Sequence, residues 1–285
     1  NETDDIWIVF NGEIYNQSSL RADLQQKGHR FRTQSDTETI VHLYEEYGDD
    51  CVDHLNGMFA FAIWDGPRNR MLIARDRLGI KPLYFHEYES GPRQGCIAFA
   101  SEIKVLLEDP GIQRGVNRNA LHLYLKHLYV PAPDSMFDGI HKLPPGHRMI
   151  CENGKKRIER WWDMKYAPEP MSLDQAVTSL EDHLRRAVKM RLMSEVPLGA
   201  YLSGGIDSSV IVALMAEMGN SPVKTFTLGF GDENAEFNEL NYAREVAQLF
   251  KTDHHEYTVR ESDVANLLPE IVWHFDEPFG GGLHT

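Results

Sequence analysis

Two different rhythms of hydrophobic and polar residues divide the chain. Short apolar runs rich in β-branched and aromatic residues dominate the first part, and they predict strands there. In chain order the expected strands are Ile6–Phe10, Phe59–Trp64, Met71–Ala74, Leu83–Tyr88 and Ile97–Ala100. Strands that follow one another in this way favour an antiparallel meander with helices grouped elsewhere, in an α+β layer structure.

Apolar residues spaced three and four positions apart predict helices in the same part of the chain. Ser35 and Glu38 have the spacing of a capping box, which marks a helix start. The expected helices are Ser18–Lys27, a segment from Ser35 to Gly48, and a segment from Asn117, a candidate N-cap, to His127. The first part is therefore expected to mix both kinds of element.

Strands and helices alternate in the second part, after the proline-containing stretch Tyr166–Met171, which we interpret as a linker. Ser172 and Gln175 form a second capping-box pattern, at the start of an amphipathic helix that reaches about Met193. The elements expected next are strand Leu198–Leu202, helix Ser208–Met218, strand Thr225–Phe230, helix Glu239–Phe250 and strand His255–Val259. This alternation implies a parallel sheet with right-handed crossovers, whose ligands bind beyond the carboxyl ends of the strands.

Composition excludes several classes of protein. The 285 residues are 42% hydrophobic and carry a net charge of −14, so they suit buried cores and not a basic nucleic-acid groove. The charge is −3 up to residue 165 and −11 after it. No apolar run approaches the length of a membrane span. Cys51, Cys96 and Cys151 form neither a disulfide framework nor a metal motif, which favours a reducing compartment, the cytoplasm.

The glycine- and serine-rich turn Ser203–Ser209 (SGGIDSS) is the strongest chemical signal in the sequence. It lies between an apolar strand and an apolar helix, where backbone N–H groups and the helix N-terminus can surround an anion. Asp207 would repel bare phosphate, so its presence predicts a Mg²⁺ ion that bridges carboxylate and phosphates. The turn is not a Walker A loop, because GxxxxGK[ST] is absent. A tight turn with a Ser N-cap is the alternative.

The dipeptide Asn11-Gly12 carries the second signal. It directly follows an expected strand, and on the residues alone it predicts a type I′ hairpin turn. Asp36 lies at an expected helix start, where the helix dipole favours a carboxylate.

Taken in order, the motifs resemble one enzyme family. Asn11–Asn16 with the preceding Phe10 (FNGEIYN) resembles the signature of class II glutamine amidotransferases, and LSGGIDSS resembles the pyrophosphate loop of ATP pyrophosphatases. The further matching segments are Leu55–Ala62, Arg75–Tyr84, Ala100–Lys104 and Leu143–Gly146, and we expect mainly structural work from the first two. The ordered set is similar to the glutamine-hydrolysing asparagine synthetase family.

The resemblance implies two domains. Residues 1–165 would form an α+β glutaminase domain of the N-terminal-nucleophile hydrolase type, an αββα sandwich, and residues 172–285 an α/β parallel-sheet synthetase domain of the adenine-nucleotide α-hydrolase-like type. It also implies that ammonia from L-glutamine, together with ATP and Mg²⁺, converts L-aspartate to L-asparagine through β-aspartyl-AMP. A homodimer is one open option, and neither nucleic acid nor membrane is an expected partner.

The resemblance further implies roles for single residues. Asn11 and Gly12 would form the oxyanion hole, and Asn11, Glu13 and Asp36 would bind glutamine. The residues implied for ATP are Leu202, Ser203, Gly204, Gly205, Asp207, Ser208, Ser209 and Leu228, with Asp207 as the magnesium ligand. For the two leucines, ordinary core packing is the alternative.

The family pattern continues beyond both ends of this sequence. Asn1 is not the nucleophilic cysteine that the family places at its mature N-terminus, and the sequence stops before a second motif, SGxGxDE, into which Asp276–Phe279 resembles the lead. We therefore interpret the chain as a segment that by itself neither hydrolyses glutamine nor makes asparagine. Two alternatives stay open: a related acyl-adenylating enzyme of the β-lactam synthetase or lasso-peptide cyclase type, and a non-catalytic truncated nucleotide-binding chain.

Overall fold

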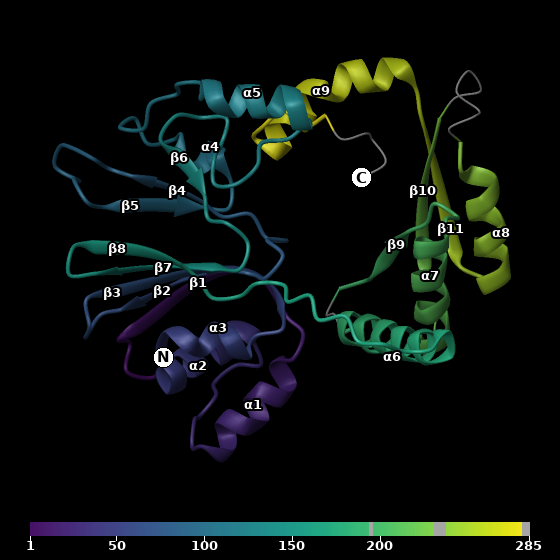
Figure 1. The fold of residues 1–285 in the computed structure, drawn as a ribbon, viewed down its shortest axis with the longest axis horizontal. Helices are drawn as coiled ribbons and strands as arrows, with labels where there is room; N and C mark the ends of the chain where they lie inside the picture. The colour runs from purple at the N-terminus through teal and green to yellow at the C-terminus, as the bar shows by residue number, and fades with distance from the viewer. Residues whose placement is uncertain (194–195, 220, 231–237, 281–285) are drawn as a thin grey trace. The chain divides into compact units, whose positions relative to one another are not determined.

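The computed structural model describes residues 1–193, 196–219, 221–230 and 238–280. Its backbone separates into two compact units (Figure 1). Unit 1 comprises residues 1–166 together with the described part of the segment that starts at Val272, and unit 2 comprises residues 167–271. The chain therefore returns to unit 1 after it has built unit 2.

Unit 1 contains two antiparallel sheets. The five-stranded sheet has the order β1-β2-β3-β7-β8, with β1 Ile6–Ile14, β2 Gly57–Asp65, β3 Arg70–Arg75, β7 His147–Glu152 and β8 Lys155–Arg160. The three-stranded sheet has the order β5-β4-β6, with β4 Tyr84–Glu87, β5 Ile97–Ala100 and β6 Ile140–Lys142. The helices are α1 Gln17–Gln26, α2 Asp36–Tyr47, the 3-10 turn η1 Gly48–Asp50, α3 Cys51–His54, α4 Ile103–Leu106 and α5 Arg118–His127.

Strand alternation in β2 creates two of the cores that stack these layers, because successive side chains point to opposite faces of a sheet. Phe59, Phe61 and Ile63 enter the core beneath α1, α2 and α3, whereas Ala60 and Ala62 enter the core between the two sheets. A third core joins the three-stranded sheet to α4. Figure 1 shows the resulting order of helices, sheet, sheet and helices, which confirms the expected αββα sandwich.

The strands do not form the single meander that their succession favoured. β2 and β3 pair in the five-stranded sheet, but β4 and β5 pair in the other sheet. The crossing between sheets is fixed by the buried carboxylate of Asp76. Its two oxygens accept hydrogen bonds from four backbone N–H groups, those of Phe59, Leu78, Ile80 and Lys81. A long-range crossing of this kind has no signature in hydrophobic periodicity.

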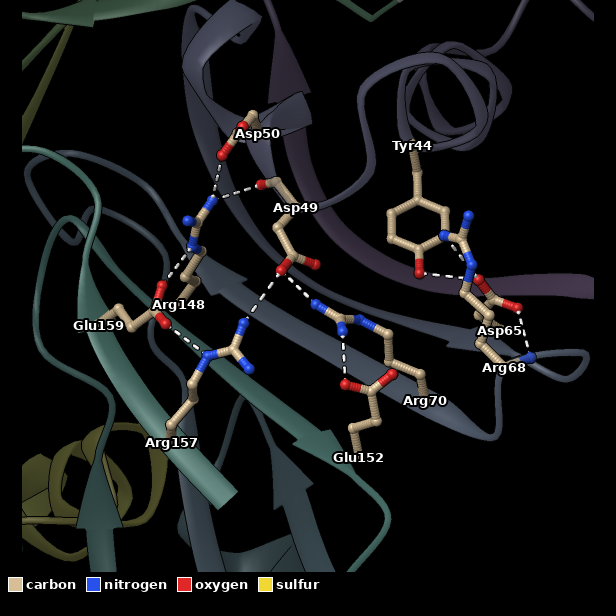
Figure 2. A network of polar contacts seen from close by, with 10 residues as sticks. All are labelled: Tyr44, Asp49, Asp50, Asp65, Arg68, Arg70, Arg148, Glu152, Arg157 and Glu159. Carbon is tan, nitrogen blue, oxygen red and sulfur yellow. Dashed lines mark hydrogen bonds and ion pairs between the residues drawn. The ribbon is translucent and has the colours of Figure 1, made fainter. Parts of the chain in front are cut away.

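Ion pairs tie η1 to the β3–β7–β8 edge of the large sheet (Figure 2). Arg70 of β3 pairs with Asp49, and with Glu152 of β7 at 2.9 Å. Arg148 of β7 reaches Asp50 at 3.0 Å and donates to the carbonyl oxygen of Asp49 at 2.7 Å. Both guanidinium groups are largely buried, so these pairs hold the end of α2 against the sheet more firmly than surface pairs would.

A second polar tie lies where α2 crosses the β2–β3 turn (Figure 2). The Tyr44 hydroxyl donates to the buried carboxylate of Asp65 at 2.9 Å, and Arg68 lies 3.4 Å from the same carboxylate. Burial and the adjacent Asp65 raise the pKa of Tyr44 to about 12, so this hydroxyl stays a donor at neutral pH.

The N-cap prediction for α2 is confirmed, but its capping box is not formed. Ser35 Oγ accepts a hydrogen bond from the N–H of Thr37. The Glu38 carboxylate instead accepts from the N–H groups of Arg32 and Thr33, at 2.6 and 2.7 Å. The Glu38 side chain, which the spacing assigned to the capping box, thus binds the loop that precedes the helix. At α5 the predicted Asn117 cap is confirmed.

The segment Val272–Gly280 is bonded into unit 1 by two acidic side chains. Asp276 accepts from the N–H of Ile103, at the start of α4, at 2.7 Å and pairs with Lys104 at 2.9 Å. Glu277 is buried, accepts from the N–H of Met136 at 2.7 Å and pairs with Lys142 at 2.6 Å. These contacts make the segment part of the unit 1 fold.

Unit 2 contains a parallel sheet, as the alternation of elements predicted. Its strands have the order β11-β10-β9, with β9 Gly199–Tyr201, β10 Lys224–Phe230 and β11 Asp253–Val259. Its helices are α6 Leu173–Arg191, α7 Ile206–Met218, α8 Leu240–Phe250 and most of α9 Glu261–Phe275, which was not predicted. The Ser172–Gln175 capping box is confirmed at the start of α6. None of the described helices has the length and hydropathy to cross a membrane.

The two faces of the unit 2 sheet differ. On one face Leu202, Val212 and Ala243 form a buried core that joins the strands to α7 and α8. On the other face Phe226 and Leu228 of β10 are 41% and 43% exposed. They line a hollow of about 330 Å³ together with Tyr201, Thr227, His255, Glu256 and Tyr257.

Candidate functional sites

The Asn11-Gly12 dipeptide lies inside β1 and not in a hairpin turn. Asn11 is opposite Ala60 and Gly12 opposite Phe59, in antiparallel register with β2. The turn prediction was wrong because long-range pairing with a distant strand overrides the local preference of the dipeptide. Glycine is required at position 12 for a steric reason. A Cβ there would lie 2.2 Å from the carbonyl oxygen of Met58 on the paired strand.

Hydrogen bonds orient the side chains at the end of β1. The Asn11 side-chain amide is exposed and donates to Ser101 Oγ at 3.0 Å. Asp36, in the first turn of α2, accepts from the N–H of Ile14 at 3.1 Å. β1 therefore carries Asn11, Gly12 and the neighbouring Glu13 close to the helix start that carries Asp36.

Asn16 fixes the chain just beyond this strand. Its Oδ1 accepts from the N–H of Asn56 at 2.9 Å, and its Nδ2 donates to the carbonyl of His54 at 2.9 Å. The N–H of Tyr15 donates to the carbonyl of Asn56 at 2.8 Å. The Leu55–Ala62 motif thus positions β1, in line with the structural work expected of it.

Ser101 is a neighbour of the candidate site that sequence reasoning did not assign. It follows β5 in the other sheet, and its contact with Asn11 spans 90 positions of sequence. Its motif, Ala100–Lys104, was recognised, but only the fold reveals which side chain it meets.

Two of the described cysteines, Cys51 and Cys151, do not offer an activated nucleophile. Burial raises the pKa of the Cys51 thiol far above its usual range. Burial also raises the pKa of Cys151. Since the thiolate is the nucleophilic form, neither thiol is poised to attack an amide.

The segment Ser203–Ser209 comprises the end of the connection from β9 and the first turn of α7. Gly204 has a φ of +79°, and a Cβ there would lie 2.5 Å from Tyr242, so both conformation and packing require glycine. The hydroxyls of Ser203 and Ser208 lie 3.0 Å apart, and the N–H of Gly205 donates to Ser203 Oγ at 3.2 Å.

The start of α7 contradicts the alternative of a simple Ser-capped turn. The N-cap is Gly205, and no side chain of the described residues caps the helix. The hydroxyls of Ser208 and Ser209 donate instead to the Gly205 carbonyl, at 3.2 and 2.7 Å. The first-turn amides of an α-helix have no intrahelical acceptor, so this end is free to bind an anion. Asp207 is exposed in the same turn.

The two leucines implied for adenine differ in surroundings. Leu202 is buried in the core with Val212 and Ala243, as the packing alternative expected. Leu228 is half-exposed beside Phe226 on the open face of the sheet. Of the two side chains, Leu228 is therefore the one that a ligand can reach.

Comparison with known proteins gives the architecture a family. Residues 1–162 match the family model described as glutamine amidotransferase domain. The chain belongs to that family. Residues 179–284 of the chain match the family model described as asparagine synthase.

Curated relatives of the chain are named as glutamine-hydrolysing asparagine synthetases. Asparagine synthetase [glutamine-hydrolyzing] 3 of Bacillus subtilis is 34% identical over 95% of this chain and 45% of its own length. A putative asparagine synthetase [glutamine-hydrolyzing] 2 of Methanocaldococcus jannaschii is 36% identical over 97% of this chain and 52% of its own. The chain thus spans about half the length of the curated relatives it matches. A solved glutamine phosphoribosylpyrophosphate amidotransferase of B. subtilis aligns with a TM-score of 0.38 and 16% identity, over 88% of this chain and 45% of that one, which is too distant to bear on function.

Proposed function

We propose that this chain is part of a glutamine-hydrolysing asparagine synthetase. Residues 1–165 supply its glutaminase domain and residues 172–285 the first part of its synthetase domain. In the whole enzyme, ammonia released from L-glutamine attacks β-aspartyl-AMP, which forms from L-aspartate and ATP with release of pyrophosphate. The observation that carries the proposal is the order of the two family matches along a single chain.

In the glutaminase domain, Asn11 and Gly12 provide the oxyanion hole. The Asn11 amide is exposed and oriented by Ser101, so it can stabilise the charge that develops on the glutamine amide oxygen. Glu13 and Asp36 provide two carboxylates for the α-ammonium group of glutamine. The contact of Asp36 with β1 supports this role, because it holds one carboxylate at the end of the strand that bears Asn11.

In the synthetase domain, the loop Ser203–Ser209 and the start of α7 bind the phosphates of ATP. The tight approach of Gly204 and the uncapped helix start support this assignment. The Asp207 carboxylate and the nearby serine hydroxyls are hard oxygen donors that suit Mg²⁺, which when bound would offset the charge of the phosphates beside Asp207. We expect Leu228 to contact the adenine ring, and the enzyme to work in the cytoplasm.

Retention of the glutaminase geometry favours this proposal over the related acyl-adenylating enzymes that use a tethered amine. Such enzymes need no oxyanion hole, whereas here Gly12 is packed at a distance that only glycine tolerates and Asn11 is hydrogen-bonded in place. A homodimeric assembly stays a prediction.

The test uses the full-length protein that contains this chain. We expect ATP–pyrophosphate exchange to depend on aspartate, and glutamine and ammonia both to support asparagine formation. Asn11→Ala should abolish the glutamine-dependent reaction and leave the ammonia-dependent one intact, whereas Asp207→Asn should abolish both. Exchange that proceeds equally without aspartate would overturn the proposed substrate.

A further inference from the structure

Three side chains with metal-binding atoms converge on unit 1, in a group separate from the candidate sites. His29 lies in the connection between α1 and α2, and His42 and Glu45 lie on one face of α2, three positions apart. His29 Nδ1 is 3.2 Å from His42 Nδ1 and 3.7 Å from Glu45 Oε2. His42 Nδ1 is 2.8 Å from the same Glu45 oxygen. Only the fold brings the first histidine to the other two residues.

Hydrogen bonds among His29, His42 and Glu45 do not satisfy all three side chains. His42 is 1% exposed, so bulk solvent does not supply hydrogen bonds to its ring nitrogens. Its Nδ1 faces both the carboxylate of Glu45 and the Nδ1 of His29, and one hydrogen on that atom would have to serve two acceptors. A cation at the centre would instead accept a lone pair from each of the three atoms.

The three separations fit a tetrahedral metal. Zinc binds imidazole nitrogen and carboxylate oxygen at about 2.0–2.2 Å, which places neighbouring ligand atoms of a tetrahedron about 3.3 Å apart. The separations of 2.8, 3.2 and 3.7 Å bracket that value. We propose that His29 Nδ1, His42 Nδ1 and Glu45 Oε2 bind one Zn²⁺-type divalent ion, with the fourth position filled by water.

The second nitrogen of each imidazole lies near carboxylates. His29 Nε2 is 3.4 Å from Glu46, and His42 Nε2 is 3.8 Å from Glu38 and 3.9 Å from Glu2. His42 Nε2 is buried and has no hydrogen-bond partner among the described residues. A carboxylate hydrogen-bonded to the second nitrogen, as Glu46 is to His29, orients a metal-binding histidine and raises its basicity. Two imidazoles and one carboxylate favour zinc over magnesium or calcium, which prefer oxygen ligands alone.

The ion would join the α1–α2 connection to α2. The first turn of the same helix bears Asp36, the carboxylate bonded to β1. A metal at this place therefore has a structural consequence, since it restrains the helix from its middle while β1 restrains its start. The inference does not depend on the proposed reaction, because it concerns residues outside that site.

The test is zinc titration of the purified full-length protein that contains this chain, after chelator treatment, followed by calorimetry and thermal unfolding. We expect one ion per chain, a higher melting temperature with zinc, and Co²⁺ substitution that gives the absorption of a tetrahedral centre. His29→Gln and Glu45→Gln should each weaken zinc binding at least ~100-fold, and Glu46→Gln about 10-fold, because Glu46 contacts the second nitrogen of His29 and not the ion.

His54→Gln is the matched control. The His54 ring stacks on Tyr47 at 4.0 Å and is not part of the cluster, so this variant should bind zinc like the unmodified chain. His29 and Glu45 are both partly exposed, and circular dichroism would verify that their variants fold. Absence of binding to the unmodified chain would overturn the proposal, and so would equal affinity in the His29→Gln and His54→Gln variants.

Discussion

Unit 1 and unit 2 bury their sheets to different degrees. In unit 1 the large sheet is covered by α1–α3 on one face and by the second sheet on the other, with ion pairs along its edge. In unit 2 the described residues form one small core, and Phe226, Leu228 and Tyr257 stay exposed on the opposite face. Because the stability of a fold increases with the apolar area it buries, we expect unit 2, which carries the candidate ATP loop, to be less stable than unit 1.

The largest expected effect contrasts two phenylalanines. Phe61→Ala removes a fully buried ring from the main core of unit 1 and should cost about 3–5 kcal/mol. Phe226→Ala, at a half-exposed position of unit 2, should cost less than about 1 kcal/mol. Urea denaturation followed by tryptophan fluorescence measures the first, because all five tryptophans belong to the described residues of unit 1. Amide hydrogen exchange of the unit 2 strands measures the effect of Phe226→Ala. An equal loss of stability in the two variants would refute the difference in burial between the two units.

The next effect tests whether the segment after Val272 stabilises unit 1. Glu277→Ala should cost about 3 kcal/mol, because it leaves Lys142 largely buried without its partner and the N–H of Met136 without an acceptor. The loss should be visible in tryptophan fluorescence during urea unfolding. Glu270→Ala, an exposed change on α9, is the control and should be near neutral. An unchanged unit 1 transition in Glu277→Ala would contradict the assignment of this segment.

A smaller effect is expected at the glycine of the unit 2 loop. Gly204→Ala combines a positive φ with a clash against Tyr242 and should cost about 2 kcal/mol. It should also weaken ATP binding by the full-length protein, measured by calorimetry. Gly205→Ala has ordinary backbone angles and should be milder in stability, although it lies in the same loop. If Gly204→Ala bound ATP normally, the loop would not be the phosphate site.

The smallest effect concerns the start of α6. Ser172→Ala removes the hydroxyl that accepts from the N–H of Gln175 and should cost about 1 kcal/mol of unit 2 stability, although the N–H of residue 172 can still donate to the Gln175 side chain. Leu180→Ala, at a position 60% exposed on the same helix, serves as the control and should change stability little. Hydrogen exchange of the α6 amides distinguishes the two. A larger loss from Leu180→Ala would mean that unit 2 buries more of this helix than its exposure indicates.

Local elements with strong periodicity were predictable from the sequence. The run Phe59–Trp64 became β2 with a slight extension, and the helices capped by Asn117 and Ser172 begin at the predicted residues. β8 was missed because it is dominated by charged side chains, and it joins the sheet through backbone pairing with β7 and through the ion pair of Glu159 with Arg148. α9 was missed because Pro269 lies inside it, where proline normally ends a helix.

Motif resemblance identified the candidate site residues, but not their partners. Asn11, Glu13, Asp36 and the loop from Ser203 come from recognisable motifs. The contact of Asn11 with Ser101 depends on how two sheets stack, and no local pattern encodes that. The meeting of His29 with α2 depends in the same way on the packing of consecutive helices.

The return of the chain to unit 1 has a consequence for recombination between related genes. A hybrid that joins residues 1–166 to a foreign synthetase half would replace Asp276 and Glu277 along with everything else after the linker. Lys104 and Lys142 would then lose their counter-charges unless the donor gene supplied an equivalent acidic pair. The segment after Val272 is thus encoded by the second half of the gene, although its acidic residues contact the domain encoded by the first half. A functional hybrid therefore requires acidic residues at positions 276 and 277 that match Lys104 and Lys142.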